Sequence, residues 1–512
     1  MGDILSALME ALLPLNIFAL SLGTLVGILA GAMPGLSSIM ALSIMTPFTF
    51  VFPGNTGILM LLGVFCGAIY GGSITAILIN TPGTANSAAT CLDGYPMARG
   101  GQPGRALSIS TTASTFGGLF SALMLFITAP ALAKVALKFG GPEYFALGIF
   151  GLSIVTGVSS KSVLKGLTGA AIGLALSTVG IDIISGRQRF TFGSIYLMGG
   201  ISYIPLLIGV YALAQGLLVV EERTKNTNDT STRKKAKLER VLPTWSDLKT
   251  CAPVMFVSAL VGTVIGAIPG TGGDIASWFG YTQAKRMSKH KEMFGHGAPE
   301  GIAAPEAANN AVSGGALIPL LTLGIPGDAG SAVMLGALMM QGIIPSPLLF
   351  QNQKHEVYVI ILGLILANLC MCILGFAGLR GFSQISNVPD EILTPIVFVF
   401  CAVGTFCMNH NMDDITFMLI CGVVGYFLLK LDYAMPPVIL GLILGPTLEK
   451  NLQKSLVISG GSFSIFFTHP ISCVLIVIAL LSLGIPFFKS IFGNIIKKKK
   501  TAATQAESSN NN

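Results

Sequence analysis

The chain has 512 residues, of which 52% are hydrophobic and only 10% are charged, and its mean hydropathy is +0.76. A soluble domain carries about a quarter charged residues, so this composition excludes a water-soluble globular protein. The formal net charge of +7 is concentrated in loops and a C-terminal tail. It therefore indicates membrane topology, and we expect no nucleic-acid partner.

Apolar runs long enough to cross roughly 30 Å of hydrocarbon recur along the chain. Examples are Ile58–Ile79, Phe116–Ala133 and Val357–Ala377. The sequence therefore predicts an all-α polytopic protein of the lipid bilayer, with roughly ten to twelve spans. Because Asp3 and Glu10 replace the basic residues of a signal peptide, the first apolar run is expected to be a retained transmembrane helix.

One hydrophilic, basic stretch divides two hydrophobic halves. The predicted organisation is a first membrane repeat at 1–220, a cytoplasmic linker at 221–248, a second repeat plus a final span at 249–490, and a disordered basic tail at 491–512. Ile471–Phe487 is the expected final span. Lysine and arginine favour the cytoplasmic side, so linker and tail are predicted to lie inside and the acidic N-terminus outside.

The two halves share glycine and Pro-Gly patterns. Gly27 and Pro34 recur as Gly262 and Pro269 at an offset of 235 residues, and Pro82 recurs as Pro326 at an offset of 244. Basic residues follow the second Pro-Gly of the first half but the first Pro-Gly of the second half. This difference predicts inverted repeats, with Pro-Gly hairpins or discontinuous helices near the membrane midplane.

A Pro-Gly pair inside an apolar run ends a helix and leaves peptide groups without partners at membrane depth. Helix N-termini attract anions, and free carbonyls bind small cations. The oxygen-bearing side chains beside these breaks are therefore candidates for binding substrate and cation, or for capping the broken helices. The candidates are Pro34, Gly35, Ser37, Ser38, Asn80, Thr81, Pro82, Gly83, Thr84, Ser87, Pro269, Gly270, Thr271, Gly272, Gly273, Asp274, Pro326, Gly327, Asp328 and Ser331.

A further polar stretch runs from Gly295 to Asn310, directly before an apolar run. Glu306, Asn309 and Asn310 have helical i, i+3, i+4 spacing, so one face carries a carboxylate and two amides. An ionisable group entering a membrane segment indicates function, although capping and packing is the alternative. The cysteines and histidines lack ligand spacing, so we expect no cofactor and no metal beyond a sodium ion at the same elements.

Two strings, GAIYGGSITAILINTPGTANSAATCLDGYPMARGGQPGRAL and GHGAPEGIAAPEAANNAVSGGALIPLLTLGIPG, resemble the large membrane subunit (TctA type) of the tripartite tricarboxylate transporters. The similarity extends from about Gly23 to Pro446. It implies import of citrate-like carboxylates driven by sodium or protons, a small four-span membrane subunit and a periplasmic solute-binding protein. Ala85 and Asn86 stand where that family leads us to expect a proline, which places citrate itself in question.

The predicted function is secondary active import of small di- or tricarboxylates across the bacterial inner membrane. The chain contains no GxSxG, HExxH or P-loop motif, which disfavours an enzyme and an ATP-driven pump. A cation/proton antiporter or a passive channel without a binding-protein partner stays open as an alternative. Asp274, Glu306 and Asp328 are the acidic residues on which an antiporter would depend.

Overall fold

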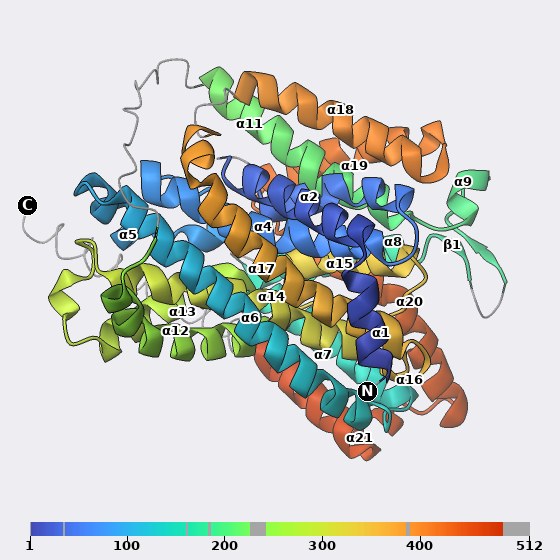
Figure 1. Ribbon diagram of the computed structural model, residues 1–512. Coiled ribbons are helices and arrows are strands. Elements are labelled where there is room, and N and C mark those ends of the chain that lie inside the picture. Colours follow the sequence, from blue (N-terminus) through green and yellow to red (C-terminus); the bar gives the residue numbers. More distant parts are fainter. Residues whose placement is uncertain are drawn as a thin grey trace, which may run out of the picture. The chain divides into compact units, whose positions relative to one another are not determined.

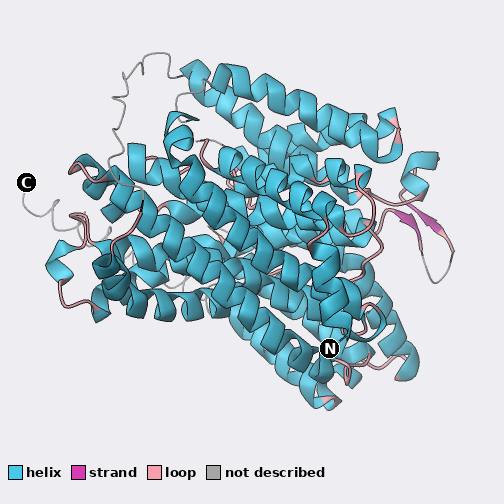
Figure 2. Cartoon of the chain, in the orientation of Figure 1, coloured by secondary structure: helices cyan, strands magenta, loops and turns pink. Residues whose placement is uncertain are grey.

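A computed structural model describes residues 2–33, 36–159, 162–182, 186–225, 242–385 and 390–484. This part of the chain is almost entirely helical, with one short two-stranded hairpin (Figure 2). The predicted all-α fold is therefore confirmed. Pro34, Gly35, most of the predicted linker and the whole predicted tail lie outside the described residues.

The first half contains most of the short elements (Figure 1). Its elements are α1 (Gly2–Ala11), α2 (Pro14–Gly31), α3 (Ser38–Met45), the 3-10 helix η1 (Pro47–Val51), α4 (Thr56–Ile79), the 3-10 helix η2 (Ala85–Ser87), α5 (Cys91–Arg99), α6 (Pro103–Ala136), α7 (Gly141–Ser159), α8 (Val163–Ser177), β1 (Gly180–Ile181), β2 (Gln188–Arg189), α9 (Ile195–Met198), α10 (Tyr203–Leu207), the π-helix η3 (Ile208–Leu213) and α11 (Ala214–Lys225). Strands β1 and β2 pair antiparallel.

The second half is built from longer helices. Its elements are α12 (Trp245–Gly266), α13 (Gly272–Met287), the 3-10 helix η4 (Lys291–Met293), α14 (Pro299–Leu323), α15 (Ala329–Met340), α16 (Leu349–Asn352), α17 (Lys354–Ile385), α18 (Asp390–Asn409), α19 (Met412–Lys430), α20 (Met435–Ile458) and α21 (Ile465–Thr468).

Seven helical segments of the described chain are long and apolar enough to cross a membrane. They are α2, α4, α6, Tyr203–Glu221, α12, Lys354–Leu379 and α19. The three runs used above as examples of spans fall within α4, α6 and α17. Shorter apolar helices add to these, among them Pro470–Gly484 at the expected final span. The chain is a multi-pass membrane protein.

The chain divides into two compact units. The smaller unit comprises 139–178, 182–186 and 432–512, and within it α7 and α8 pack on α20. The larger unit comprises 1–138, 179–181 and 187–431, and it contains every candidate site residue. The predicted repeats at 1–220 and 249–490 both contribute to the larger unit, and their boundaries stay a prediction.

The helix ends in the larger unit repeat from one half to the other. Helix α2 packs along α4, as α12 packs along α14. Both α4 and α14 end on a residue in the left-handed conformation, Asn80 at φ 57° and Gly324 at φ 71°. These two residues are separated by the offset of 244 residues that relates the Pro-Gly motifs. The duplication inferred from sequence therefore extends to local backbone geometry.

The glycine of the second Pro-Gly pair in each half, Gly83 or Gly327, lies against the C-terminal end of α2 or α12. A Cβ atom on Gly83 would lie 2.0 Å from the Gly31 carbonyl oxygen, and one on Gly327 would lie 2.1 Å from that of Gly266. Real Cβ atoms do not approach backbone so closely, so only glycine allows this crossing. Each half uses the same backbone contact to place its second helix break beside its first.

Contacts along the long helices give their relative directions. Helices α4 and α17 run in the same direction, α17 and α6 run in opposite directions, and α6 and α14 run in the same direction. The contacts are Leu59 with Gly363 and Tyr70 with Gly375 (α4–α17), Asn368 with Gly118 and Gly375 with Thr111 (α17–α6), and Ala307 with Gly117 and Gly314 with Ser121 (α6–α14). It follows that α4 and its counterpart α14 run in opposite directions.

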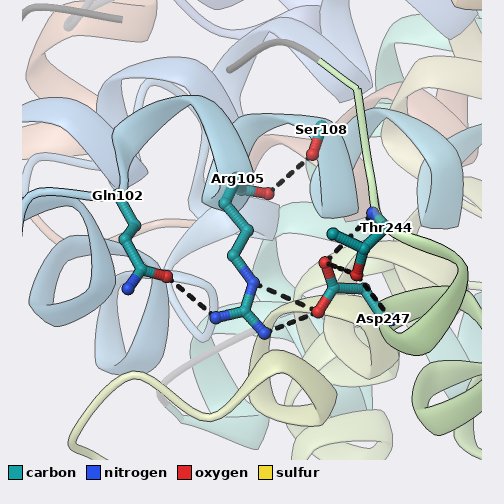
Figure 3. A network of polar contacts seen from close by, with 5 residues as sticks. All are labelled: Gln102, Arg105, Ser108, Thr244 and Asp247. Carbon is teal, nitrogen blue, oxygen red and sulfur yellow. Dashed lines mark hydrogen bonds and ion pairs between the residues drawn. The ribbon is translucent and has the colours of Figure 1, made fainter. Parts of the chain in front are cut away.

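The N-terminal ends of α6 and α12 are joined by an ion pair (Figure 3). Arg105 donates from Nε and Nη2 to Oδ1 of Asp247, at 3.1 and 2.5 Å. A capping box starts α12: Oδ2 of Asp247 accepts the Thr244 N–H at 3.2 Å, and the Thr244 hydroxyl oxygen accepts the Asp247 N–H at 3.0 Å. The connection between α5 and α6, which Arg99 and Arg105 flank, therefore lies at the end of the larger unit where the second half begins.

A second carboxylate fixes the other basic loop to the same end. Oδ1 of Asp93, in α5, accepts the backbone N–H groups of Gly295, Gly297 and Ala298 at 2.8 to 2.9 Å. These groups precede α14, where a helix N-terminus favours an anion. Since this loop follows the basic end of α13, both basic segments of the sequence lie together.

Candidate functional site

Helix α14 carries a polar face into the interior. Glu306, Asn309 and Asn310 are at most 1% exposed, and all three lie within this continuous 25-residue helix. The helical spacing predicted from their sequence positions is therefore correct. The Asn310 amide donates to the Glu306 carbonyl oxygen at 3.2 Å, which is a bond within the helix. Glu306 accepts hydrogen bonds from residues outside α14, whereas the Asn309 amide has no hydrogen-bond partner in the described structure.

The Glu306 carboxyl group is surrounded by hydroxyl groups of the first half. Ser73 of α4 and Thr90 each donate to Oε1, at 2.6 and 2.5 Å, and Ser114 of α6 donates to Oε2 at 2.9 Å. Ser110 of α6 also lies against the carboxyl group, and its buried hydroxyl has no partner in the described structure. None of the ion pairs among the described residues includes Glu306.

Asn309 is fully buried, yet neither its Oδ1 nor its Nδ2 atom has a hydrogen-bond partner among the described residues. A buried amide without partners loses the hydrogen bonds it makes in water, at a cost of about 1 to 3 kcal/mol. A Cβ atom on Gly273 would lie 2.5 Å from Oδ1 of Asn309 and 2.6 Å from Nδ2 of Asn86. Two amide side chains from different halves therefore meet at Gly273.

Gly273 lies in the first turn of α13, a helix of 16 residues. Thr271 precedes the helix without capping it, since its hydroxyl donates to the carbonyl oxygens of Ile265 and Ile268. No group of the described chain accepts the N–H groups of Gly272 and Gly273. The first turn of α13 thus presents free donors and the positive end of a helix dipole beside two amides.

The helix breaks lie in pairs. In the second half, the Gly270 N–H donates to the Gly327 carbonyl oxygen at 2.7 Å. Across the halves, α13 packs on η2, and α3 packs on α15. Each element after a first break therefore contacts the element after the second break of the other half. Pro34 and Gly35, at the first break, are not among the described residues.

Several candidates have a structural role that accounts for them. Ser37 accepts the Met40 N–H and caps α3, and Asp328 forms a capping box with Ser331 at the start of α15. The Ser87 hydroxyl donates to the Thr84 carbonyl oxygen within η2. The alternative of helix capping therefore applies to these side chains.

The remaining candidates differ in burial. Asn80, Thr81 and Asp274 are exposed, whereas Ser38 and Thr84 are buried, and the Thr84 hydroxyl has no partner in the described structure. The prolines Pro269 and Pro326 are buried, and Pro82 is half-buried. The described residues include no group of three or more His, Cys, Asp or Glu side chains that could hold a metal ion.

The hydroxyl ligands of Glu306 are not among the residues predicted from the helix breaks. Ser73, Ser110 and Ser114 lie inside long helices, and Thr90 directly precedes α5. The signal in the sequence is the run SISTTAST at 108–115, which is unusually rich in hydroxyl groups for a membrane helix. Asp93, which accepts the three backbone N–H groups before α14, is also not among the predicted residues. Its signal in the sequence is the string DGYPMARGG.

Comparisons with known proteins identify the family of the chain. Residues 17–440 match the profile of the Tripartite tricarboxylate transporter TctA family. An Agrobacterium vitis protein described as "Uncharacterized 52.8 kDa protein in TAR-I ttuC' 3'region" is 39% identical over 484 residues, which are 94% of this chain and 95% of that protein. Another from the same organism, "Uncharacterized protein in TAR-II ttuC' 3'region", is 35% identical over 230 residues, which are 45% of this chain and 95% of that protein. No solved structure matches the chain.

Proposed function

Because the chain belongs to the tripartite tricarboxylate transporter TctA family, we propose that it imports small di- or tricarboxylates by secondary active transport. The family makes it a membrane component of a tripartite transporter. The finer proposal is that a periplasmic solute-binding protein delivers the carboxylate, that a small four-span subunit completes the membrane complex, and that a sodium or proton gradient drives uptake.

The observation that carries this proposal is the unpartnered amide of Asn309 beside the first turn of α13. A carboxylate accepts hydrogen bonds from amide Nδ2 groups and from free backbone N–H groups, and the helix dipole favours its charge. Asn309, Asn86, Gly272 and Gly273 offer these donors together. We therefore assign a substrate carboxylate to the space between α13, α14 and η2.

Alternating access is supported by the arrangement of the halves. We propose that they are inverted repeats, and the opposite directions of α4 and α14 favour this reading. The site takes α13 and α14 from one half and η2 from the other. A site between inverted repeats is exposed to either side when one part moves against the other.

The proposed topology places the N-terminus outside and the linker and C-terminal tail in the cytoplasm of a bacterial cell. Support comes from the two basic loops, which Asp93 and the Arg105–Asp247 pair hold at one end. Lysine and arginine are enriched on the cytoplasmic side of inner-membrane proteins.

Reconstituted transport tests the proposal. Liposomes that contain the chain with its two partner components should accumulate at least one of succinate, malate and citrate, with saturation and only under a sodium or proton gradient. Omission of the binding protein should abolish accumulation. Non-saturable flux without a gradient would instead favour a passive channel, and exchange of cations alone would favour an antiporter.

A further inference from the structure

The environment of Glu306 combines complete burial with hydroxyl contacts and no cation. Its side chain is 0% exposed, and its three hydrogen-bond donors are neutral. The arginines, lysines and histidines of α4, α5, α6, α12 and α13 form neither an ion pair nor a hydrogen bond with it in the described structure. An ionised carboxylate in such a place is costly unless a cation or a proton joins it.

From this geometry we infer that Glu306 is the proton-binding residue that couples the gradient to carboxylate import. The inference rests on the proposed function and names its coupling ion. In the neutral state the carboxyl proton lies on Oε2 and is donated to the Ser114 hydroxyl oxygen. In the ionised state the same hydroxyl rotates and donates to Oε2, so both states keep their hydrogen bonds.

The oxygen spacing favours a proton over sodium. Hydroxyl oxygens of Ser73, Thr90 and Ser114 lie 2.5 to 2.9 Å from the carboxyl oxygens, which is hydrogen-bond contact. Oxygen ligands that surround one cation at 2.3 to 2.6 Å lie roughly 3.3 to 3.7 Å apart in octahedral geometry. A sodium ion among these oxygens would have to push them apart, whereas a proton requires no such space.

Glu306 is also connected to the proposed carboxylate site. Asn309 follows it by one helical turn on the same face of α14. On the other side, Thr90 bonds to Glu306, and its N–H group donates to the Ser87 carbonyl oxygen of η2, next to Asn86. A carboxylate beside ionised Glu306 would meet a like charge one turn away. Protonation removes that repulsion, so proton and substrate bind cooperatively.

Other titratable groups do not replace Glu306 in this role. Tyr70 of α4 and Cys91 of α5 face it, and both are neutral at physiological pH. The side chains of α6 that lie against the Glu306 carboxyl group are the hydroxyls of Ser110 and Ser114. Asp274 is exposed, and Asp328 is occupied in the capping box of α15. Glu300, the other buried glutamate of α14, accepts the Ser288 hydroxyl at 2.8 Å and provides a matched control.

The test uses the whole transporter in sodium-free liposomes that contain a pH-sensitive dye, with succinate, malate and citrate as probes. An inward proton gradient should drive uptake, and the lumen should acidify with each carboxylate imported. The apparent KM should rise about tenfold per pH unit above the titration midpoint for a single required proton. Glu306→Gln should retain carboxylate exchange across the membrane, lose acidification and become independent of pH, whereas Glu300→Gln should behave as wild type.

Two further variants keep the test valid if Glu306→Gln fails to fold. Ser73→Ala and Thr90→Ala each remove a donor that stabilises the ionised form, so uptake should persist to higher pH. Uptake that requires sodium and acidifies nothing, or an unmoved pH limit in both variants, would overturn the proton assignment alone. Failure of wild type to transport any probe under any gradient would reject the proposed function itself.

Discussion

The substitution Gly273→Ala directly perturbs the proposed carboxylate site. Its new methyl group would lie 2.5 Å from Oδ1 of Asn309 and 2.6 Å from Nδ2 of Asn86. Both distances are below normal van der Waals contact, so each amide must rotate away from Gly273. The neighbouring helix backbone is compatible with alanine, because positive φ occurs at Gly270 and Gly272 but not at Gly273.

The expected loss follows from two contributions. Displacing the two amides from their rotamers costs about 0.5 to 1.5 kcal/mol each. Loss of one hydrogen bond to the charged substrate adds about 1.5 to 3 kcal/mol. Since the amides can relax partly, we expect a net loss of about 2 to 3 kcal/mol, or roughly 30- to 150-fold in KM. Alanine is a better helix former than glycine by about 1 kcal/mol, which offsets part of the cost of displacing the amides, so the melting temperature should change only slightly.

The assay is saturable carboxylate uptake by the reconstituted transporter, with thermal unfolding measured on the same preparation. Gly199→Ala is the matched control, because its φ is −73° and its nearest contact to a new methyl group is 3.9 Å away. The control should leave KM and melting temperature unchanged. A correctly folded Gly273→Ala protein with wild-type KM would refute the assignment of substrate to this turn.

Three other expectations concern Asn309, the Arg105–Asp247 pair and Glu10. Asn309→Leu should raise KM at least about tenfold while the melting temperature stays unchanged or rises, since the amide has no partner to lose; a lower melting temperature with normal uptake would contradict this. Arg105→Ala leaves Asp247 with 4% exposure and no cation, and because the arginine is itself 36% exposed we expect a loss of only about 1 to 2 kcal/mol, measured by thermal unfolding and partly restored by Asp247→Asn. Burial raises the pKa of Glu10, but hydrogen bonds, chiefly from His355, hold the pKa below its ordinary value of 4.5. Ionised Glu10 therefore stabilises the fold above pH 4.5, and that stability is lost as pH falls through the lower folded value, so melting temperatures measured from pH 6 to pH 3 should show an acid loss that His355→Ala removes.

The sequence predicts the architecture well where the signal is local. Apolar runs locate α4, α6 and α17, and Pro-Gly pairs locate the ends of α4 and α14. The spacing of Glu306 and Asn309 correctly predicts a shared helix face. These features depend on helix period and on backbone conformations that only a few residue types adopt.

The partners of these residues could not be predicted, because they come from distant parts of the chain. Ser73 is 233 residues from Glu306, and nothing near Ser73 distinguishes its hydroxyl from those that bond to their own helix. Capping and binding also use the same residue types, so Ser37 and Asn309 look alike in sequence. Only the structure shows that one hydroxyl is occupied by a cap and that the other side chain has no partner.

Positions that the duplication makes equivalent carry different residues in the two halves. Offsets of 244, 244 and 235 residues place Phe65, Gly330 and Ser38 where the proposed site has Asn309, Asn86 and Gly273. A Cβ atom on Gly330 would lie 2.7 Å from the Phe65 ring, so an aromatic ring fills the equivalent crossing.

The proposed proton-binding group also occurs in only one half, because Leu62 stands where the second half has Glu306. The apolar side chains of Phe65 and Leu62 offer neither a donor for a carboxylate nor a group that binds a proton. The first half therefore supplies hydroxyls and one amide to a site whose main groups belong to the second. We expect one carboxylate bound per chain in equilibrium binding to the detergent-solubilised transporter. A stoichiometry of two would show that the apolar crossing also binds substrate and would contradict this assignment.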